Sequence, residues 1–161
     1  PTALHGLLNE YINLAYHGLR ALQPGLNVTI EREFDPAVNL VEIAAQDFGR
    51  VILNLVNNAC YAVQSKVRDV GLGYKPVIRV RTRDLQDRVE ITVWDNGPGV
   101  SESELGRLFE PFYTTKPTGE GTGLGLSISY GIVVEEHGGT LDVQSVPGES
   151  ITFTITIPKA R

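Results

Sequence analysis

One stretch of the sequence, residues 110–126, combines residue types that would close over an anionic ligand. An aromatic turn leads to a lysine and then to a Pro/Gly-rich segment, after which a glycine cluster opens directly into a helical pattern. A phosphate-bearing ligand is therefore the leading hypothesis. The stretch contains Glu110-Pro111-Phe112-Tyr113-Thr114-Thr115-Lys116 and, four residues later, Gly121-Thr122-Gly123-Leu124-Gly125-Leu126.

Two asparagines, Asn54 and Asn58, stand four residues apart beside the apolar stripe of a predicted helix, so they stack on one side of it. Asparagine is a mediocre helix former because its amide competes for backbone partners. They could line a solvent-facing side or bond to a neighbouring loop, or they could bind a ligand. Asn58 offers a neutral carbonyl oxygen that suits magnesium, which keeps waters and phosphate oxygens as its other ligands.

Asp95 ends a predicted buried strand and begins the sequence Asp95-Asn96-Gly97-Pro98-Gly99. A carboxylate in this place, followed by glycines that let the backbone approach a ligand, could receive an exocyclic amine. The same short pattern is also a common turn, and by itself it favours the turn.

Apolar periodicity predicts the elements that must position these residues. Helical spacing covers residues 4–22, a long segment from Ala44, a short segment capped by Ser101, and a segment from Gly125 to the stop at Gly138-Gly139. Strand patterns occupy residues 27–34, 77–83, 88–94, 140–146 and 151–157, and the first of these could lie at an edge. The composition of residues 66–76 predicts a loop.

The alternating Arg79, Arg81 and Arg83 on one predicted strand have two interpretations. They could form a docking patch for a partner. They could also line a solvated strand face, with Glu90 pairing with one of them across a hairpin.

The three histidines of the chain are candidate functional groups. His5 or His17 could accept a phosphoryl group, but neither precedes an acidic residue that would orient its imidazole, and a surface or partly packed histidine is the alternative. For His137, in the last turn of its helix, we expect an interaction with the helix dipole.

Length and composition limit the class of protein. The 161 residues, 42% of them apolar, are typical of one soluble domain. The single cysteine, Cys60, excludes an internal disulfide and a cysteine zinc site, and the net charge of -5 argues against nucleic acid as a partner. No apolar run suits a membrane span or a signal peptide. We expect a cytoplasmic domain without membrane contact, which could be part of a longer, membrane-anchored protein.

Together the motifs resemble the catalytic and ATP-binding domain of bacterial two-component sensor histidine kinases. These belong to the GHKL group with DNA gyrase, heat-shock chaperones and mismatch-repair ATPases. The resemblance, from about Leu4 to Pro158, implies the Bergerat fold: an α/β (α+β) two-layer sandwich whose mixed, mostly antiparallel sheet is covered on one face by about three helices, with a flexible ATP lid. Residues 1–161 would form a single domain, with the linker or first helix at 1–22 and the lid at 100–122.

The resemblance implies roles for the residues at the base and the metal. Asn58 would hold Mg²⁺, and Asp95 would accept a hydrogen bond from the amino group of adenine. Gly97 and Gly99 would let the chain pass close to the base.

The resemblance also implies roles at the phosphates. Phe112 would be the hinge of the lid, and Lys116 would approach the phosphates. The amides around Gly123 and Gly125 would cradle phosphate oxygens at a helix start, where N–H groups are unsatisfied. Further nucleotide contacts are implied for Thr114, Thr115, Gly121, Thr122, Leu124 and Leu126.

Asn54 bears on the mechanism. In the ATP hydrolases of the group, this position is typically a glutamate that activates water, whereas an amide cannot take a proton. Hydrolysis should therefore be poor, and phosphoryl transfer would rely on positioning and charge neutralisation by Asn54, Asn58 and Lys116. The sequence departs from the family at Tyr61, where a basic residue is frequent, and at Ser150-Ile151, where Gly-Thr or Gly-Ser is usual.

The resemblance implies partners outside this chain. The helical hairpin with the phosphoacceptor histidine is absent from the sequence, so a dimeric histidine domain of the same full-length kinase, and then a response regulator, would receive the phosphoryl group. Two alternatives remain open: a GHKL protein serine kinase of the anti-sigma type, and a degenerate module that only docks nucleotide or partners.

Overall fold

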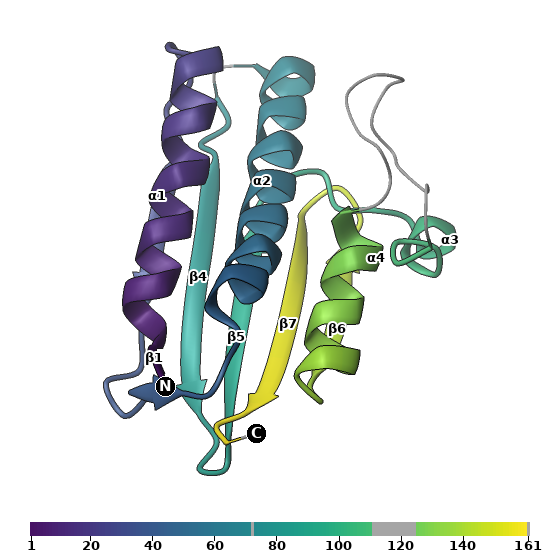
Figure 1. Cartoon of the computed structure of the whole chain (residues 1–161). Helices are drawn as coiled ribbons and strands as arrows, with labels where there is room; N and C mark the ends of the chain where they lie inside the picture. Colours follow the sequence, from purple (N-terminus) through teal and green to yellow (C-terminus); the bar gives the residue numbers. More distant parts are fainter. Residues whose placement is uncertain (72, 111–124, 161) are drawn as a thin grey trace.

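The computed structural model describes residues 1–71, 73–110 and 125–160, and Figure 1 shows their arrangement. Five strands form one sheet in the order β2-β4-β5-β7-β6. β2 and β4 are parallel, and the other three neighbouring pairs are antiparallel. The strands are β2 (Thr29–Glu33), β4 (Val77–Asp84), β5 (Arg88–Asp95), β6 (Thr140–Val146) and β7 (Ser150–Pro158).

Three helical rods lie side by side on one face of this sheet (Figure 1). They are α1 (Leu4–Leu22), α2 (Ala45–Val70) and α4 (Gly125–Tyr130), which continues as the π-helix η1 (Gly131–Glu136). A single turn, α3 (Glu102–Leu105), lies beside them and is capped by Ser101, whose hydroxyl accepts the Glu104 N–H. The α+β two-layer sandwich with a mixed, mostly antiparallel sheet is therefore confirmed.

The core lies between the two layers. Each strand alternates because successive side chains point to opposite faces, and the apolar set faces the helices. The stripe of α2 packs onto it at three- and four-residue steps. Fully or nearly fully buried members include Phe48, Val51, Ile52, Leu55 and Val56 of α2 and Ile78, Val80, Ile91, Phe153, Ile155 and Ile157 of the sheet.

The arginines of β4 form ion pairs on the open face of the sheet. Arg79 pairs with Glu31 at 2.8 Å, Arg81 pairs with Glu33, and Arg83 lies 3.3 Å from Glu90. These charges are matched by neighbouring strands, which supports the solvated face over a docking patch. β2 is one of the two edge strands, as the sequence suggested.

Two local expectations differ from the structure. Residues 66–70 belong to α2 rather than to the predicted loop, and the helix ends at Gly71, whose φ of 79° suits glycine and whose N–H bonds to the Val67 carbonyl at 3.0 Å. A two-stranded ribbon of β1 (Thr2–Ala3) and β3 (Leu40–Val41) was not predicted, because two residues are too few to show a period.

Candidate functional site

Asn54 joins α2 to the start of α4. Its amide nitrogen donates to the Gly125 carbonyl and to the Ser129 hydroxyl, both at 3.3 Å. Gly125 and Ser129 are four residues apart, so they lie on the same side of α4 and one amide group reaches both. The structure thus gives Asn54 a definite partner, which the sequence did not identify.

Asn58 and Ala62 continue from Asn54 along the same side of α2, one turn at a time. Asn58 is half-buried. Ala62 lies against Gly97, because a Cβ built on that glycine would come within 2.9 Å of the Ala62 Cβ. One side of α2 therefore leads from Gly125 to the loop after β5, and Asn58 stands between the two.

Asp95 is buried under this loop, with only 2% of its surface exposed. It lies opposite Ile78 on one neighbouring strand and Ile151 on the other. Burial among these apolar groups raises the pKa of Asp95 to about 7, and the Gly97 N–H and the charge of Lys66 lower it in part. Oδ1 accepts the Gly97 N–H at 2.8 Å, whereas no donor among the described residues bonds to Oδ2.

The two glycines of the loop are needed for different reasons. A Cβ on Gly97 would lie 2.7 Å from Asp95 Oδ1, so a side chain there would press on the carboxylate. Gly99 has a φ of +65°, and a Cβ on it would lie 2.7 Å from the Ser145 hydroxyl and the Val146 carbonyl oxygen. Gly99 thus packs the loop onto the β6–β7 turn, and its role toward a base stays a prediction.

A polar cluster around Asn96 positions this loop, and sequence reasoning missed it. The Asn96 side chain accepts the Val77 N–H at 2.8 Å and the Tyr74 hydroxyl at 3.0 Å. Lys66 donates to the carbonyls of Asn96 and Gly148 at 3.3 and 3.0 Å and lies 4.9 Å from the centre of the Tyr74 ring. The only signal in the sequence was a lysine, a tyrosine and an asparagine in polar segments, which is too common a pattern to interpret.

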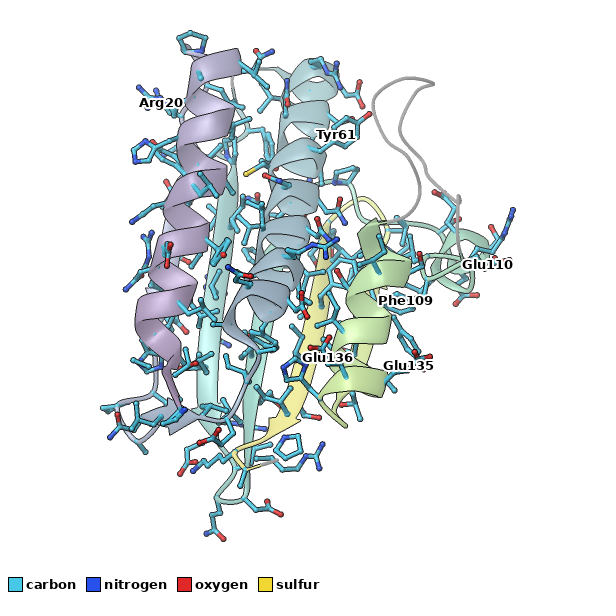
Figure 2. All side chains as sticks on the ribbon, viewed as in Figure 1. Arg20, Tyr61, Phe109, Glu110, Glu135 and Glu136 are labelled. Atoms are coloured by element: carbon cyan, nitrogen blue, oxygen red, sulfur yellow. The ribbon has the colours of Figure 1, made fainter. Side chains whose placement is uncertain are left out.

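The two departures from the family pattern lie near this site. Ile151 is directly opposite Asp95 in the sheet, so the usual polar residue is replaced by an apolar neighbour of the carboxylate. Tyr61 projects from α2 (Figure 2). Cys60, beside it, is buried, and burial followed by the charge of Asp95 raises its pKa to about 12, so this thiol does not ionise at neutral pH.

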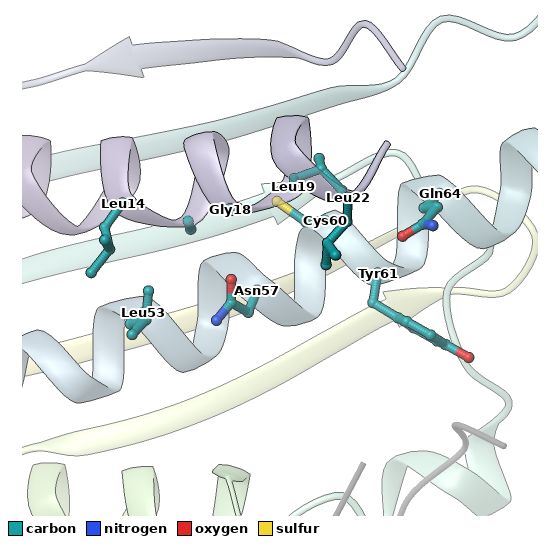
Figure 3. A pocket seen from close by; sticks show the side chains of 10 residues that line it. Leu14, Gly18, Leu19, Leu22, Leu53, Asn57, Cys60, Tyr61 and Gln64 are labelled. Carbon is teal, nitrogen blue, oxygen red and sulfur yellow. The ribbon is translucent and has the colours of Figure 1, made fainter. Parts of the chain in front are cut away.

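A groove of about 440 Å³ lies between α1 and α2 (Figure 3). The groove is mostly apolar, with Leu14, Leu22 and Leu53 on its walls. Asn57 lines the same groove, which explains why this polar residue stands on the helix beside the apolar stripe. Asn57 therefore belongs to a different side of α2 from Asn54 and Asn58. None of the residues that line the groove is a predicted nucleotide contact.

His137 has a role that the sequence did not predict. Its Nε2 accepts the Ala44 N–H at 3.0 Å, just before α2, and its Nδ1 donates to the Ile132 carbonyl at 2.8 Å. The bond to the Ile132 carbonyl is one that a histidine in the last turn of a helix can make, and the interaction with the helix dipole stays a prediction. The bond to Ala44, the residue before α2, joins the end of η1 to the start of α2.

The other two histidines gain no support as phosphoryl acceptors. His5 is half-buried, stacks on Phe34 with ring centres 4.6 Å apart, and bonds to the Thr82 hydroxyl at 2.8 Å. His17 is exposed on α1. α1 lies on the other side of α2 from α4 (Figure 1), away from Asn54 and Gly125.

Of the predicted site residues, the structure brings Asn54 and Gly125 into contact and places Gly97 against Asp95. Leu126 is half-buried and packs on the core. Phe109, just before the predicted hinge, packs on Tyr130 and Phe153 with ring centres 5.5 and 6.5 Å apart. The predictions for Phe112, Thr114, Thr115, Lys116, Gly121, Thr122, Gly123 and Leu124 lie outside the described residues.

The fold and the paired asparagine and aspartate motifs define a class of nucleotide-binding domain, and comparison with known proteins gives the family. Residues 43–161 match the family described as histidine kinase-, DNA gyrase B-, and HSP90-like ATPase. The chain belongs to this family.

Within the family, the chain is similar to sensor histidine kinases. It is 37% identical to the sensor histidine kinase ZraS of Klebsiella oxytoca over 94% of the chain, and 31% identical to the sensory histidine kinase/phosphatase NtrB of Rhizobium leguminosarum bv. phaseoli over all of it. It spans 30% and 42% of the lengths of these relatives.

Solved structures show the same likeness. The catalytic domain of the histidine kinase ThkA, in a nucleotide-free form, has a TM-score of 0.79 and 31% identity, covering 99% of this chain and 94% of that one. ThkA in complex with the response regulator protein TrrA has a TM-score of 0.74 and 28% identity, covering 98% of this chain and 41% of that one.

Proposed function

We propose that this chain binds Mg·ATP along the side of α2 that carries Asn54, Asn58 and Ala62. The observation that carries the proposal is the continuity of this side, which contacts Gly125 of α4 at one end and Gly97 beside Asp95 at the other. At 1.5 Å per residue the side spans about 12 Å. An acceptor for the base and an amide oxygen for a metal therefore lie along one line.

The chemistry of Asp95 fits an adenine amino group. The carboxylate is buried, one oxygen is bonded to the Gly97 N–H, and no donor among the described residues bonds to the other. No buried side-chain oxygen of the described residues lacks a partner, so this second oxygen is accessible, and an exocyclic amine could donate to it. Gly97 lets the loop lie directly against Asp95 and Ala62, where a Cβ would clash.

Asn58 fits a magnesium ion bound together with phosphates. Magnesium prefers oxygen ligands and few protein groups, and the described residues contain no cluster of three or more His, Cys, Asp or Glu side chains that could hold a metal by themselves. When bound, the ion would neutralise phosphate charge. Phe112, Thr114, Thr115, Lys116 and residues 121–126 would complete the phosphate side, and residues 100–122 would form the lid.

The reaction proposed is transfer of the γ-phosphoryl group to a histidine of a phosphoacceptor domain in the same full-length, dimeric protein. A nitrogen–phosphorus bond forms at the unprotonated imidazole nitrogen. The bond from the γ-phosphorus to the bridging oxygen breaks, and ADP leaves with the electron pair. The proton of the other imidazole nitrogen passes to an acceptor on that domain. This chain contributes positioning and charge neutralisation, which dominate phosphoryl transfer.

The relatives support the proposed partners. This chain spans 30% and 42% of two histidine kinase relatives, and ThkA was solved with a response regulator. We therefore assign a response regulator as the next acceptor. The cytoplasm as the location, with no nucleic acid or membrane partner, is part of the same proposal. None of the helices that the structure describes is long and apolar enough to cross a bilayer.

Calorimetric titration with Mg·ATP tests the binding step. Asn58→Ala should lower the affinity for Mg·ATP by about 10- to 100-fold, since it removes a charge-assisted contact, and should leave the affinity measured in EDTA unchanged. An equal loss in EDTA would show that Asn58 only supports the fold. Absence of binding by the unaltered protein at millimolar nucleotide would leave only a degenerate docking module.

Radiolabelled ATP with an added phosphoacceptor domain tests the transfer step. Label on histidine is lost in acid, so an acid-labile product is expected. An acid-stable product would indicate a serine kinase of the anti-sigma type.

A further inference from the structure

Ser129 is a buried polar residue that the proposed function leaves without a role. None of its surface is exposed. Its hydroxyl has the Asn54 amide as its hydrogen-bond partner, at 3.3 Å. A hydroxyl in the interior is costly unless it is bonded, and an apolar residue would fill the position without that cost. The pair that Ser129 makes with Asn54 is therefore the feature to explain.

The two acceptors on α4 determine which way the Asn54 amide faces. The Gly125 carbonyl oxygen can only accept, so its partner must be the NH₂ group and not the amide oxygen. An NH₂ group has two protons, and the Ser129 hydroxyl takes the second. With both protons used on α4, the amide orientation has no alternative.

The amide oxygen consequently takes no part in the bonds to α4, although it lies 4.0 Å from a Cβ built on Gly125. No donor among the described residues bonds to Asn54 Oδ1, and Asn54 is half-buried rather than enclosed. Asn58, the proposed magnesium ligand, lies one turn further along the same side of α2. Magnesium keeps several of its waters when it binds to proteins, and those waters are hydrogen-bond donors.

We propose that Ser129 is a positioning residue: together with the Gly125 carbonyl it holds the Asn54 amide with its oxygen toward the nucleotide, where it accepts a hydrogen bond from the hydration shell of the bound magnesium. This inference rests on the proposed function. It gives Ser129 no contact with the reacting atoms, because it acts only through Asn54.

The same arrangement selects an amide over a carboxylate at position 54. Aspartate would place an oxygen 3.3 Å from the Gly125 carbonyl oxygen, where the amide nitrogen now lies. The two oxygens would repel each other, and the hydrogen bond from position 54 to Gly125 would be lost. Aspartate at this position therefore conflicts with the arrangement.

Ser129→Cys and Ser129→Ala test the proposal. Cysteine keeps nearly the volume of serine but is a weak acceptor, so it separates the hydrogen bond from packing, whereas alanine loses both. Each protein is titrated with Mg·ATP and, separately, with ATP in EDTA. In the nucleotide-free state, ¹H–¹⁵N spectra follow the side-chain NH₂ protons of Asn54.

Both variants should bind Mg·ATP about tenfold more weakly, the equivalent of one hydrogen bond, with unchanged affinity in EDTA. One Asn54 NH₂ proton should move upfield and exchange faster with water. If Ser129→Cys bound Mg·ATP like the unaltered protein, or lost affinity equally in EDTA, the positioning role would be wrong while the proposed function stood. If the unaltered protein bound no Mg·ATP, both the proposed function and the positioning role of Ser129 would be refuted.

Discussion

Asp95→Asn separates the cost of burying this residue from its use as an acceptor. Asparagine has the same shape, is neutral, and keeps one oxygen for the Gly97 N–H. We expect the variant to be more stable than the unaltered protein at pH 8 and to bind ATP more weakly. The two effects have opposite signs, so a general disruption of the fold cannot produce both.

The gain in stability follows from the pKa of Asp95, which burial raises from 3.8 to about 7. Because the folded pKa lies above the unfolded one, the unfolded chain ionises first, and the folded state loses stability as the pH rises from about 4 to about 7. At 1.36 kcal/mol per pKa unit, this loss is about 4 kcal/mol at pH 8, about 2 kcal/mol at pH 5 and under about 1 kcal/mol at pH 4. Asparagine does not ionise, although its amide must also be desolvated, so it should recover about 1–4 kcal/mol at pH 8.

The loss of ATP binding follows from counting acceptors. The carboxylate has two oxygens for two donors, the Gly97 N–H and the adenine amine, whereas the amide has one oxygen. One donor must lose its bond, which costs about 2 kcal/mol, or about 30-fold in affinity.

Urea unfolding at pH 4, 5 and 8, with calorimetry at pH 8, measures both effects. A variant less stable than the unaltered protein at pH 8, or a difference in stability that does not change with pH, would refute the burial argument. ATP affinity that stays the same would show that Asp95 is only a turn residue.

Three further substitutions test the surroundings of the site. Gly97→Ala places a Cβ 2.7 Å from Asp95 Oδ1, so it should lower the free energy of unfolding in urea by about 1–3 kcal/mol and weaken ATP binding. Gly106→Ala is the control, because no atom lies within 4 Å of a Cβ built there. Equal effects of the two substitutions would contradict the argument. Lys66→Met removes a charge that lowers the pKa of Asp95, so the carboxyl should titrate above about 7 by ¹³C NMR, and an unchanged midpoint would exclude that coupling. His137→Ala loses two buried hydrogen bonds and should destabilise the protein by about 2–4 kcal/mol, whereas the exposed His17→Ala should change stability by less than about 0.5 kcal/mol.

Much of the fold could be predicted because its elements carry regular patterns. The apolar stripe of α2 predicted that helix, and the alternation of β4, β5 and β7 predicted these strands and the hairpin between β4 and β5. Ser101 predicted the start of α3. The predictions failed where no period exists, as in the two-residue strands β1 and β3, or where local composition conflicts with helix continuity. Residues 66–70 include three charged side chains, yet they extend α2 because the chain meets no glycine before Gly71.

The candidate site also has parts that the sequence could predict and parts that it could not. Asn58, Asp95 and Gly97 could be selected as candidates because each belongs to a motif whose own members lie within a few residues of one another along the chain. The contacts that orient them could not, because they join distant segments: Asn54 with Ser129, 75 residues apart, Lys66 with Gly148, 82 apart, and His137 with Ala44, 93 apart. No spacing rule relates residues at such separations, and serine, lysine and histidine are too common to be singled out.

The place of β7 in the sheet has a consequence for synthesis on the ribosome. β7 follows all the other strands in the sequence, yet it lies between β5 and β6 and bonds to both. Until residues 150–158 have left the ribosome, β5 and β6 each present an unpaired edge, and such edges invite pairing with other chains. Contacts between residues so far apart along the chain also form slowly. Because Ile151 lies opposite Asp95 in the sheet, the surroundings of this carboxylate are completed only in that last step, so a nascent chain should gain affinity for ATP no earlier than β7 inserts.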